Sequence, residues 1–191
     1  ANAGAFESFV PGRRQALWQV LSLLKPRRAL PLLDYLVSTE EQEDPLADPP
    51  VELPAMSELE IVMADFSTMQ LSTGRHPVSF YRKWADKNNI YSCMGLRLGI
   101  DGDDVAVAGG VICRQRPETA KGFVFLTLED ETGMANVVIN PKIYEIYRPV
   151  ILSTQFLCIR GRLQLEQGVC NVIARHFEYL PPVNSVSDEK V

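Results

Sequence analysis

The sequence of 191 residues contains few of the side chains that build metal or redox sites. Its histidines are His76 and His176, and none of its four cysteines forms a C-x-x-C pair. Because structural zinc needs paired ligands at short spacing, the sequence disfavours a zinc site. Buried free thiols are the better interpretation, since a reducing compartment keeps cysteines reduced. The cysteines are Cys93, Cys113, Cys158 and Cys170.

Long hydrophobic runs and common catalytic motifs are also missing. No stretch is apolar for the roughly 20 residues that cross a bilayer, and the start lacks the basic and apolar regions of a signal peptide. The sequence has no P-loop, no G-x-S-x-G elbow and no H-E-x-x-H helix. We therefore expect a soluble, cytoplasmic protein with no membrane partner. The chain opens on alanine in what reads as the middle of a protein, so we expect a fragment of a longer chain.

Basic residues are absent from about one sixth of the chain. Residues 34–65 carry ten carboxylates and no lysine or arginine, although the formal net charge of the whole chain is only −5. In residues 105–180 the balance reverses, with eight basic residues against seven carboxylates. An acidic average therefore does not exclude a local anion-binding face in the second half of the chain.

The first half of the chain is predicted to be helical around a linker. Residues 1–37 form a helical segment, with a helix over 13–24 that ends before Pro26 and a second short helix within 27–37. The stretch STEEQEDPLADPPVELP is too charged and too rich in proline to build a core. Residues 38–56 are therefore interpreted as an acidic, proline-rich surface linker.

Residues 57–100 are predicted to be a helical connector. Ser57 and Glu60 have the spacing of a capping box, and apolar residues follow along one helical face. Pro77 suits the first position of a further short helix. Packing surfaces, rather than cofactor sites, are the expected role of both apolar faces. These faces are Leu59, Val62, Met63, Phe66 and Met69 in the first helix, and Phe80, Tyr81 and Trp84 in the second.

Residues 101–180 contain five strand-like runs rich in valine, isoleucine and phenylalanine, namely 105–113, 122–129, 134–140, 154–163 and 169–177. Between the third and fourth runs, Asn140 and Pro141 indicate a helix start. Three strands, a helix and two strands is the order of an OB-fold. The predicted fold class is therefore mixed: a five-stranded, Greek-key OB-fold β-barrel preceded by a small α-helical region, with a flexible tail over 181–191.

The second run predicts a nucleic-acid-binding face. Val124, Leu126 and Leu128 share one face, which leaves Phe123 and Phe125 on the water-facing side. Exposed aromatic rings can stack on bases while cations neutralise phosphates. The alternative is that both rings pack under a helix from residues 57–90. The cations expected to contact phosphates are Arg114, Arg116, Lys121, Arg160 and Arg162.

Three stretches carry a resemblance to a known family. The run GFVFLTLEDETGMANVVINP, with VAGGVICRQRPETAKG before it and CIRGRLQLEQGVCNVIA after it, resembles the C-terminal OB domain of bacterial C-family DNA polymerases. Within that family it is most similar to the error-prone polymerase, a paralogue of the DNA polymerase III alpha subunit. AGAFESFVPGRRQALWQ resembles the end of the tandem helix-hairpin-helix region, and LPAMSELEIVMADFSTMQLSTGRHPVSFYR the connector.

The resemblance implies a DNA-directed DNA polymerase, a nucleotidyltransferase that acts in translesion synthesis, DNA repair and damage-induced mutagenesis and uses Mg²⁺. Such chemistry needs carboxylates that hold two metal ions roughly 4 Å apart. The cluster Asp101, Asp103 and Asp104 surrounds a glycine just before a strand, which is typical of a tight turn. We therefore expect no catalytic residue and no cofactor in this fragment.

The barrel also resembles the anticodon-binding domain of class II aminoacyl-tRNA synthetases, and this analogy suggests roles for two residues. Phe125 stands five residues before Asp130, as does a base-stacking phenylalanine of those domains. Asn136 occupies the place of a polar residue that contacts a base edge. The analogy therefore adds Asn136 to the predicted site.

Three functions remain open at this stage. The favoured one is a single-stranded-DNA-binding module of an error-prone polymerase. The second is a tRNA-anticodon-type RNA-binding domain. The third is a docking module that recruits the sliding clamp or other mutagenesis proteins. A clamp-binding pentapeptide would support docking, but only QALWQ hints at one, and we expect Leu17 and Trp18 to pack inward on a helix.

Overall fold

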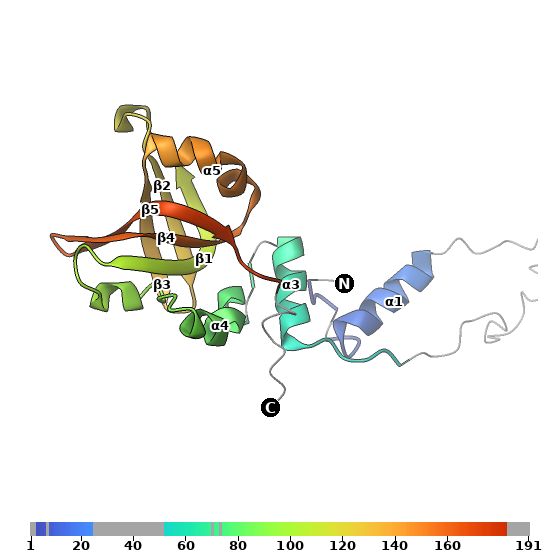
Figure 1. The fold of residues 1–191 in the computed structure, drawn as a ribbon. Helices are drawn as coiled ribbons and strands as arrows, with labels where there is room; N and C mark the ends of the chain where they lie inside the picture. The colour runs from blue at the N-terminus through green and yellow to red at the C-terminus, as the bar shows by residue number, and fades with distance from the viewer. Residues whose placement is uncertain (1–2, 7, 25–51, 70, 73, 183–191) are drawn as a thin grey trace, which may run out of the picture. The chain divides into compact units, whose positions relative to one another are not determined.

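A computed structural model describes residues 3–6, 8–24, 52–69, 71–72 and 74–182 (Figure 1). The chain divides into two compact units, Ala1–Ser72 and Thr73–Val191, and each is described by itself. The helix expected within 27–37, most of the acidic linker and the end of the tail lie outside the described residues.

The first unit contains α1 (Arg13–Leu24) and α3 (Glu58–Met69). The predicted capping box is confirmed, because the Ser57 amide donates to Oε2 of Glu60 over 2.8 Å and the Glu60 amide donates to Oγ of Ser57 over 3.3 Å. Arg13 of α1 forms an ion pair with the buried Asp65 of α3. The expectation that Trp18 packs inward is wrong: its side chain is 41% exposed.

The second unit opens with short helical turns. The helix expected from Pro77 is split into the 3₁₀ turn η1 (Pro77–Tyr81) and the helix α4 (Arg82–Lys87), and a further turn, η2 (Gly95–Leu98), follows. His76 caps η1, because its Nδ1 accepts a hydrogen bond from the Val78 amide over 3.2 Å. The prediction of a helix start at Pro77 is therefore confirmed.

Five strands then form a closed barrel in the order β1-β2-β3-β5-β4. Strands β3 and β5 pair in parallel and the other neighbours are antiparallel. The barrel is an OB-fold preceded by helices, as the sequence predicts. The elements are β1 (Asp104–Gln115), η3 (Glu118–Ala120), β2 (Val124–Asp130), β3 (Gly133–Ile139), α5 (Pro141–Ser153), β4 (Phe156–Glu166) and β5 (Val169–Tyr179).

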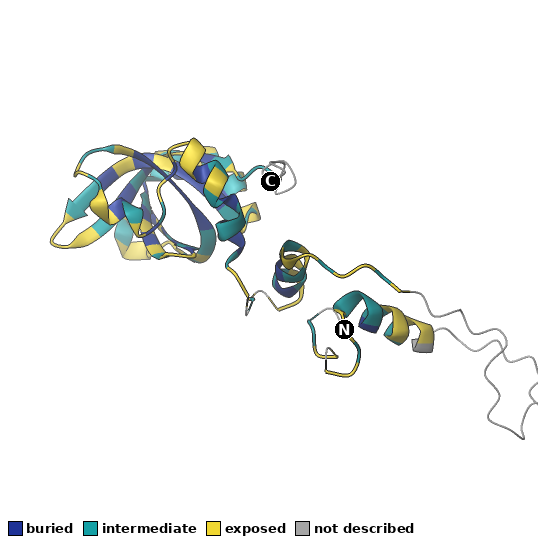
Figure 2. Ribbon diagram, turned by 90° about the horizontal axis from the view of Figure 1, so that it is seen from below, coloured by how far each residue is buried: buried dark blue, intermediate teal, exposed yellow. Residues whose placement is uncertain are grey.

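The core fills the inside of the barrel and continues through both of its ends. Buried residues line the inner side of the strands in Figure 2. Helix α5 contributes the fully buried Ile151 to this core, and η2 contributes Leu96. The connector before the barrel is therefore part of its hydrophobic core.

Helix α4 covers part of the outer wall of the barrel. Ala85 and Ile90 pack against outward side chains of β1 and β4, which are small there: Ala106, Ala108 and Cys158. The rings of Phe123 and Phe125 lie instead at β2. Within the second unit, α4 is thus placed on β1 and β4 rather than on β2.

A β-bulge in β1 reverses its alternation. Val111 pairs with the inward Leu128, whereas Cys113 pairs with the outward Thr127, so Ile112 is the extra residue. Beyond the bulge, Arg114 pairs with Leu126 and points to the inner side. A bulge adds one residue to a strand and changes which side chains face the core. The bulge therefore decides which side of β1 the Arg114 side chain faces.

Candidate nucleic-acid interface

The outer side of β2 is the centre of the candidate interface. Its inward residues Val124, Leu126 and Leu128 are almost completely buried. Phe123 and Phe125 are 37% and 38% exposed. The predicted facing of this strand is therefore confirmed, because alternate side chains of a strand point to opposite sides.

Strand pairing extends this face across the barrel in two rows. Phe125 pairs with Val138 of β3, which pairs with Ile173 of β5. We call these three residues the apolar row. Two residues farther along β2 lies a second row of paired residues, which we call the polar row. It consists of Thr127, Asn136, Asn171 and Gln164.

The predicted site residues Phe125 and Asn136 both lie on this face, but their neighbours on β5 were not predicted. Alternation along β5 places Asn171 and Ile173 on one face, which the sequence could have indicated. Their position beside Asn136 and Val138 depends on the parallel pairing of β3 with β5, which joins segments separated by α5 and β4. That pairing follows only from the closed barrel.

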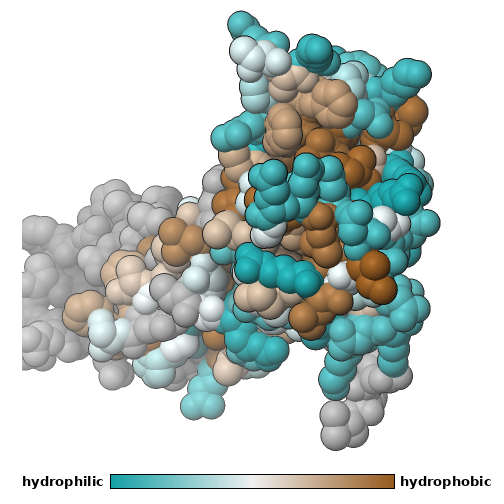
Figure 3. All heavy atoms as spheres, turned by 90° about the vertical axis from the view of Figure 1, so that its left-hand side faces the viewer, coloured by the Kyte–Doolittle hydropathy of each residue, from teal (hydrophilic) through white to brown (hydrophobic). Residues whose placement is uncertain are grey.

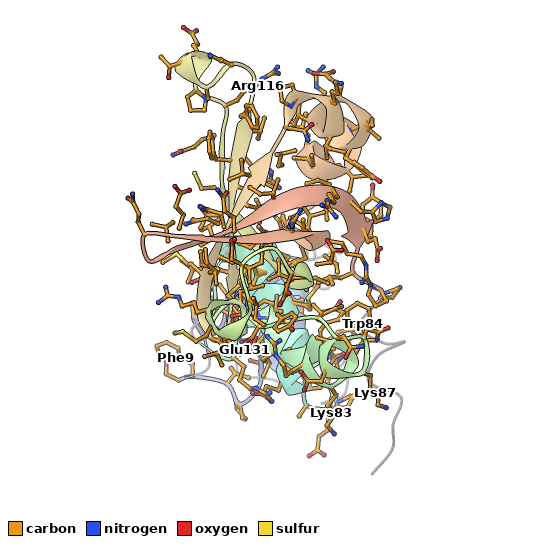
Figure 4. The ribbon with its side chains drawn as sticks, turned by 60° about the vertical axis from the view of Figure 1, so that its left-hand side comes forward. Phe9, Lys83, Trp84, Lys87, Arg116 and Glu131 are labelled. Carbon is orange, nitrogen blue, oxygen red and sulfur yellow. The ribbon has the colours of Figure 1, made fainter. Side chains whose placement is uncertain are left out.

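Two of the predicted cations lie at the end of this face that is next to α5. The guanidinium of Arg116 lies 5.0 Å from the centre of the Tyr144 ring of α5, and Figure 4 places it at this end of the barrel. Lys121 has a left-handed backbone conformation and leads directly into Phe123. Neither cation forms an ion pair within the described part of the chain. We call Arg116 and Lys121 the basic rim.

The other three predicted cations are engaged elsewhere. Arg114 donates to the carbonyl oxygens of Ile151, over 2.9 Å, and Thr154, so it caps the C-terminal end of α5. Arg160 donates to Glu178 over 3.2 Å. The Nε atom of Arg162 donates to the Gly102 carbonyl over 3.0 Å. Their expected phosphate contacts stay predictions, and the structure does not gather these three residues beside Phe125.

A buried carboxylate fixes the far end of β2. Asp130 accepts hydrogen bonds from the Cys93 amide over 2.8 Å and from Nη2 of Arg82 over 3.0 Å. It also accepts from the Thr132 amide, the Thr132 hydroxyl and the Gly133 amide. The β2–β3 turn is thereby tied to α4 and to the segment before η2.

The donors around Asp130 decide its ionisation. Burial by itself would raise the pKa of this carboxyl group. Hydrogen bonds from Thr132 and the Cys93 amide, together with the Arg82 charge, outweigh burial and hold the pKa below its ordinary value of 3.8. Asp130 is therefore a charged group of the fold at neutral pH.

The described residues contain no cluster of three or more histidine, cysteine, aspartate or glutamate side chains that could hold a metal ion. Asp101 accepts from the Leu165 amide and Asp103 from the Ile100 amide, so both organise the turn before β1. Burial raises the pKa of Cys93 to about 12 and of Cys158 to about 11. In the part of the chain that the structure describes, no helix is long and apolar enough to span a membrane.

The barrel is similar to a known family of domains. Residues 105–180 match the tRNA_anti-codon family model, described as an OB-fold nucleic acid binding domain. The chain is 40% identical over 185 residues to an error-prone DNA polymerase of Sinorhizobium medicae, a match that covers 96% of this chain and 16% of that polymerase. The chain matches the C-terminal OB-fold region of error-prone DNA polymerases.

A second relative extends the match over almost the whole chain. The error-prone DNA polymerase of Caulobacter vibrioides is 40% identical over 193 residues, which cover 99% of this chain and 17% of that protein. The chain thus spans about one sixth of the length of the curated relatives it matches. Among solved structures, asparaginyl-tRNA synthetase from Pyrococcus horikoshii is 21% identical, with a TM-score of 0.41, over 47% of this chain and 22% of that one.

Proposed function

We propose that the apolar row and the basic rim bind single-stranded DNA. The observation that carries this proposal is the exposure of Phe125 on the outer side of β2, next to two cations without ion-pair partners in the described residues. An exposed aromatic ring contributes little to a hydrophobic core. Stacked on a base, such a ring contributes roughly 1–3 kcal/mol to binding.

Single-stranded DNA suits this surface better than duplex DNA. The flat faces of bases are free to stack only when the strand is unpaired. In this proposal, Arg116 and Lys121 neutralise the phosphates of the nucleotides whose bases stack on Phe123 and Phe125. The polar row offers amide and hydroxyl groups to base edges.

Within a longer polymerase the bound strand would be the template. The parent protein would be a DNA-directed DNA polymerase of the bacterial cytoplasm that acts in translesion synthesis and damage-induced mutagenesis, with Mg²⁺ held by carboxylates outside this chain. The proposed work of this region within that polymerase is to hold DNA.

Fluorescence anisotropy of a labelled single-stranded oligonucleotide tests this proposal. The chain should bind more tightly at low salt than at high salt, and duplex DNA should compete poorly. Matched RNA as a competitor distinguishes a DNA-binding from an RNA-binding barrel. Tyr179→Ala is the control for an exposed ring outside the two rows. Absence of binding at low salt would overturn the proposal.

Protein docking is the second candidate, and one observation favours it. Leu98 of η2 is 89% exposed, and Ile100 next to it is also exposed. Exposed apolar groups in a cluster mark protein interaction sites. If the chain binds no DNA, titration with a purified sliding clamp, with Leu98→Ser as the variant, tests whether this surface recruits a partner.

A further inference from the structure

A small pocket opens beside the polar row, at the end of the barrel opposite α5. It has a volume of about 240 Å³ and lies between η2, the start of β3 and the β4–β5 turn. This volume is below the roughly 300–1,000 Å³ of pockets that hold drug-sized ligands. Its lining includes Arg97, Met134, Asn136, Gly168, Val169 and Cys170.

The pocket is lined by both apolar and polar side chains. Met134 and Val169, both exposed, contribute apolar groups, and Figure 3 shows apolar residues between hydrophilic ones on this side of the barrel. Asn136 supplies an amide and Arg97 a guanidinium. The Arg97 charge lies near enough to Cys170 to oppose the rise that burial causes in the pKa of this thiol.

A pocket that combines apolar side chains with an amide and a guanidinium suits a nucleobase. Arginine binds O6 and N7 of guanine through two hydrogen bonds, and asparagine binds N6 and N7 of adenine in the same way. No carboxylate lines the pocket, and Arg97 has no ion-pair partner among the described residues. Gly168 lies at the β4–β5 turn with φ +81°, and a side chain there would meet no described atom within 4 Å, so the mouth of the pocket is open.

We propose that this pocket binds one unstacked purine base of the single strand that also stacks on Phe125. This inference rests on the proposed function and adds a base-reading site to it. Arg97 belongs to η2 and precedes residues 105–180, which match the domain family, so the site combines the barrel with its connector.

Phe125 and the pocket lie close enough together for one DNA strand to reach both. Asn136 and Val138 are two residues apart on the same side of β3, a spacing of roughly 6.8 Å. Val138 is the cross-strand partner of Phe125, and Asn136 is the partner of Thr127. A DNA strand that crosses the barrel from the basic rim toward η2 would therefore meet Phe125 first and the pocket next.

Oligothymidine strands that carry one adenine, one guanine, one cytosine or one abasic site test the inference by anisotropy with the 191-residue chain. A purine at the favoured position should bind about fivefold or more tightly than the abasic site. Arg97→Gln should remove this preference and leave the affinity for the abasic strand unchanged. Arg148→Gln, an exposed arginine of α5, should keep the preference. Equal binding of all four strands would overturn the inference.

Thiol alkylation separates failure of the pocket from failure of DNA binding. Cys113 lies on the outer face beside Thr127, and Cys170 lies in the pocket. A bound purine strand should slow alkylation of both. Protection of Cys113 alone would refute the pocket and keep the DNA-binding face, whereas protection of neither would refute both.

Discussion

The inner and outer sides of β2 differ in burial and in the residues that they carry. The inner side, from Val124 to Asp130, is buried, and its last member is a carboxylate that accepts five hydrogen bonds. The outer side carries two partly exposed phenylalanines. Packing and hydrogen bonds therefore explain the inner side, whereas the rings of the outer side are the ones that we propose to bind DNA.

Leu128→Ala should have the largest effect on stability. Leu128 is fully buried in the barrel core, and truncation of a buried leucine costs roughly 2–5 kcal/mol through lost burial and the cavity left behind. Urea unfolding should show a lower midpoint with an unchanged slope. A loss below about 1 kcal/mol would mean that the inner side of β2 is not packed as described.

Asp130→Asn should lower the free energy of unfolding by about 1–3 kcal/mol. All five groups that bind Asp130 are donors, so the amide NH₂ of asparagine would face donors and leave at least one of them unsatisfied. Glu131→Gln, on the exposed neighbour that also pairs with Arg82, is the matched control and should cost less.

The cost of Asp130→Asn should depend on pH. Because the folded pKa of Asp130 is held below 3.8, its contribution to stability is present above that value and is lost as the pH falls through the folded pKa. The difference in unfolding free energy between the two proteins should be constant above about pH 5 and shrink in acid. A difference that grows in acid would contradict the lowered pKa.

Phe125→Ala should act on binding instead of stability. Loss of the ring should weaken single-strand binding by roughly 1–3 kcal/mol, while the melting temperature changes little because the ring is not in the core. Anisotropy and thermal unfolding of the same preparation check this. A large fall in melting temperature with unchanged affinity would place the ring in the fold rather than in the interface.

Arg116→Ala should have the smallest effect. It should weaken binding of all sequences alike and reduce the slope of log affinity against log salt by about 0.7, the contribution of one phosphate contact in single strands. Arg175→Ala, whose guanidinium forms an ion pair with Asp104, is the control cation. A loss restricted to one base would show that Arg116 reads sequence instead of phosphate.

The strand order, the helix start at Asn140 and the facing of β2 could be predicted because each follows from local patterns. Alternation, turn glycines and capping residues act within a few positions of the chain. The Asn140 side chain indeed accepts a hydrogen bond from the Ile143 amide over 2.9 Å. The exposure of Phe125 could be predicted from alternation, whereas Asn136 was proposed only by analogy with the anticodon-binding domains.

The positions of the predicted cations could not be read from the sequence. Strict alternation would place Arg114 on the outer side, but the bulge at Ile112 turns it to the inner side, where it caps α5. A second register shift, beside Arg160, leaves Arg175 as an extra residue paired with Asp104. Bulges depend on how two strands fit together, so a single strand does not reveal them.

The hydrogen bonds that join Asp130 to Arg82 and Cys93 connect the barrel to the residues that precede it, so the two should be transplanted together. A barrel cut at the start of β1 would keep the five strands but lose Leu96 from its core and two of the five donors of its buried carboxylate. A barrel transplanted into another protein should therefore carry α4 and η2 along with it, because its core and its buried carboxylate both depend on residues that precede the first strand.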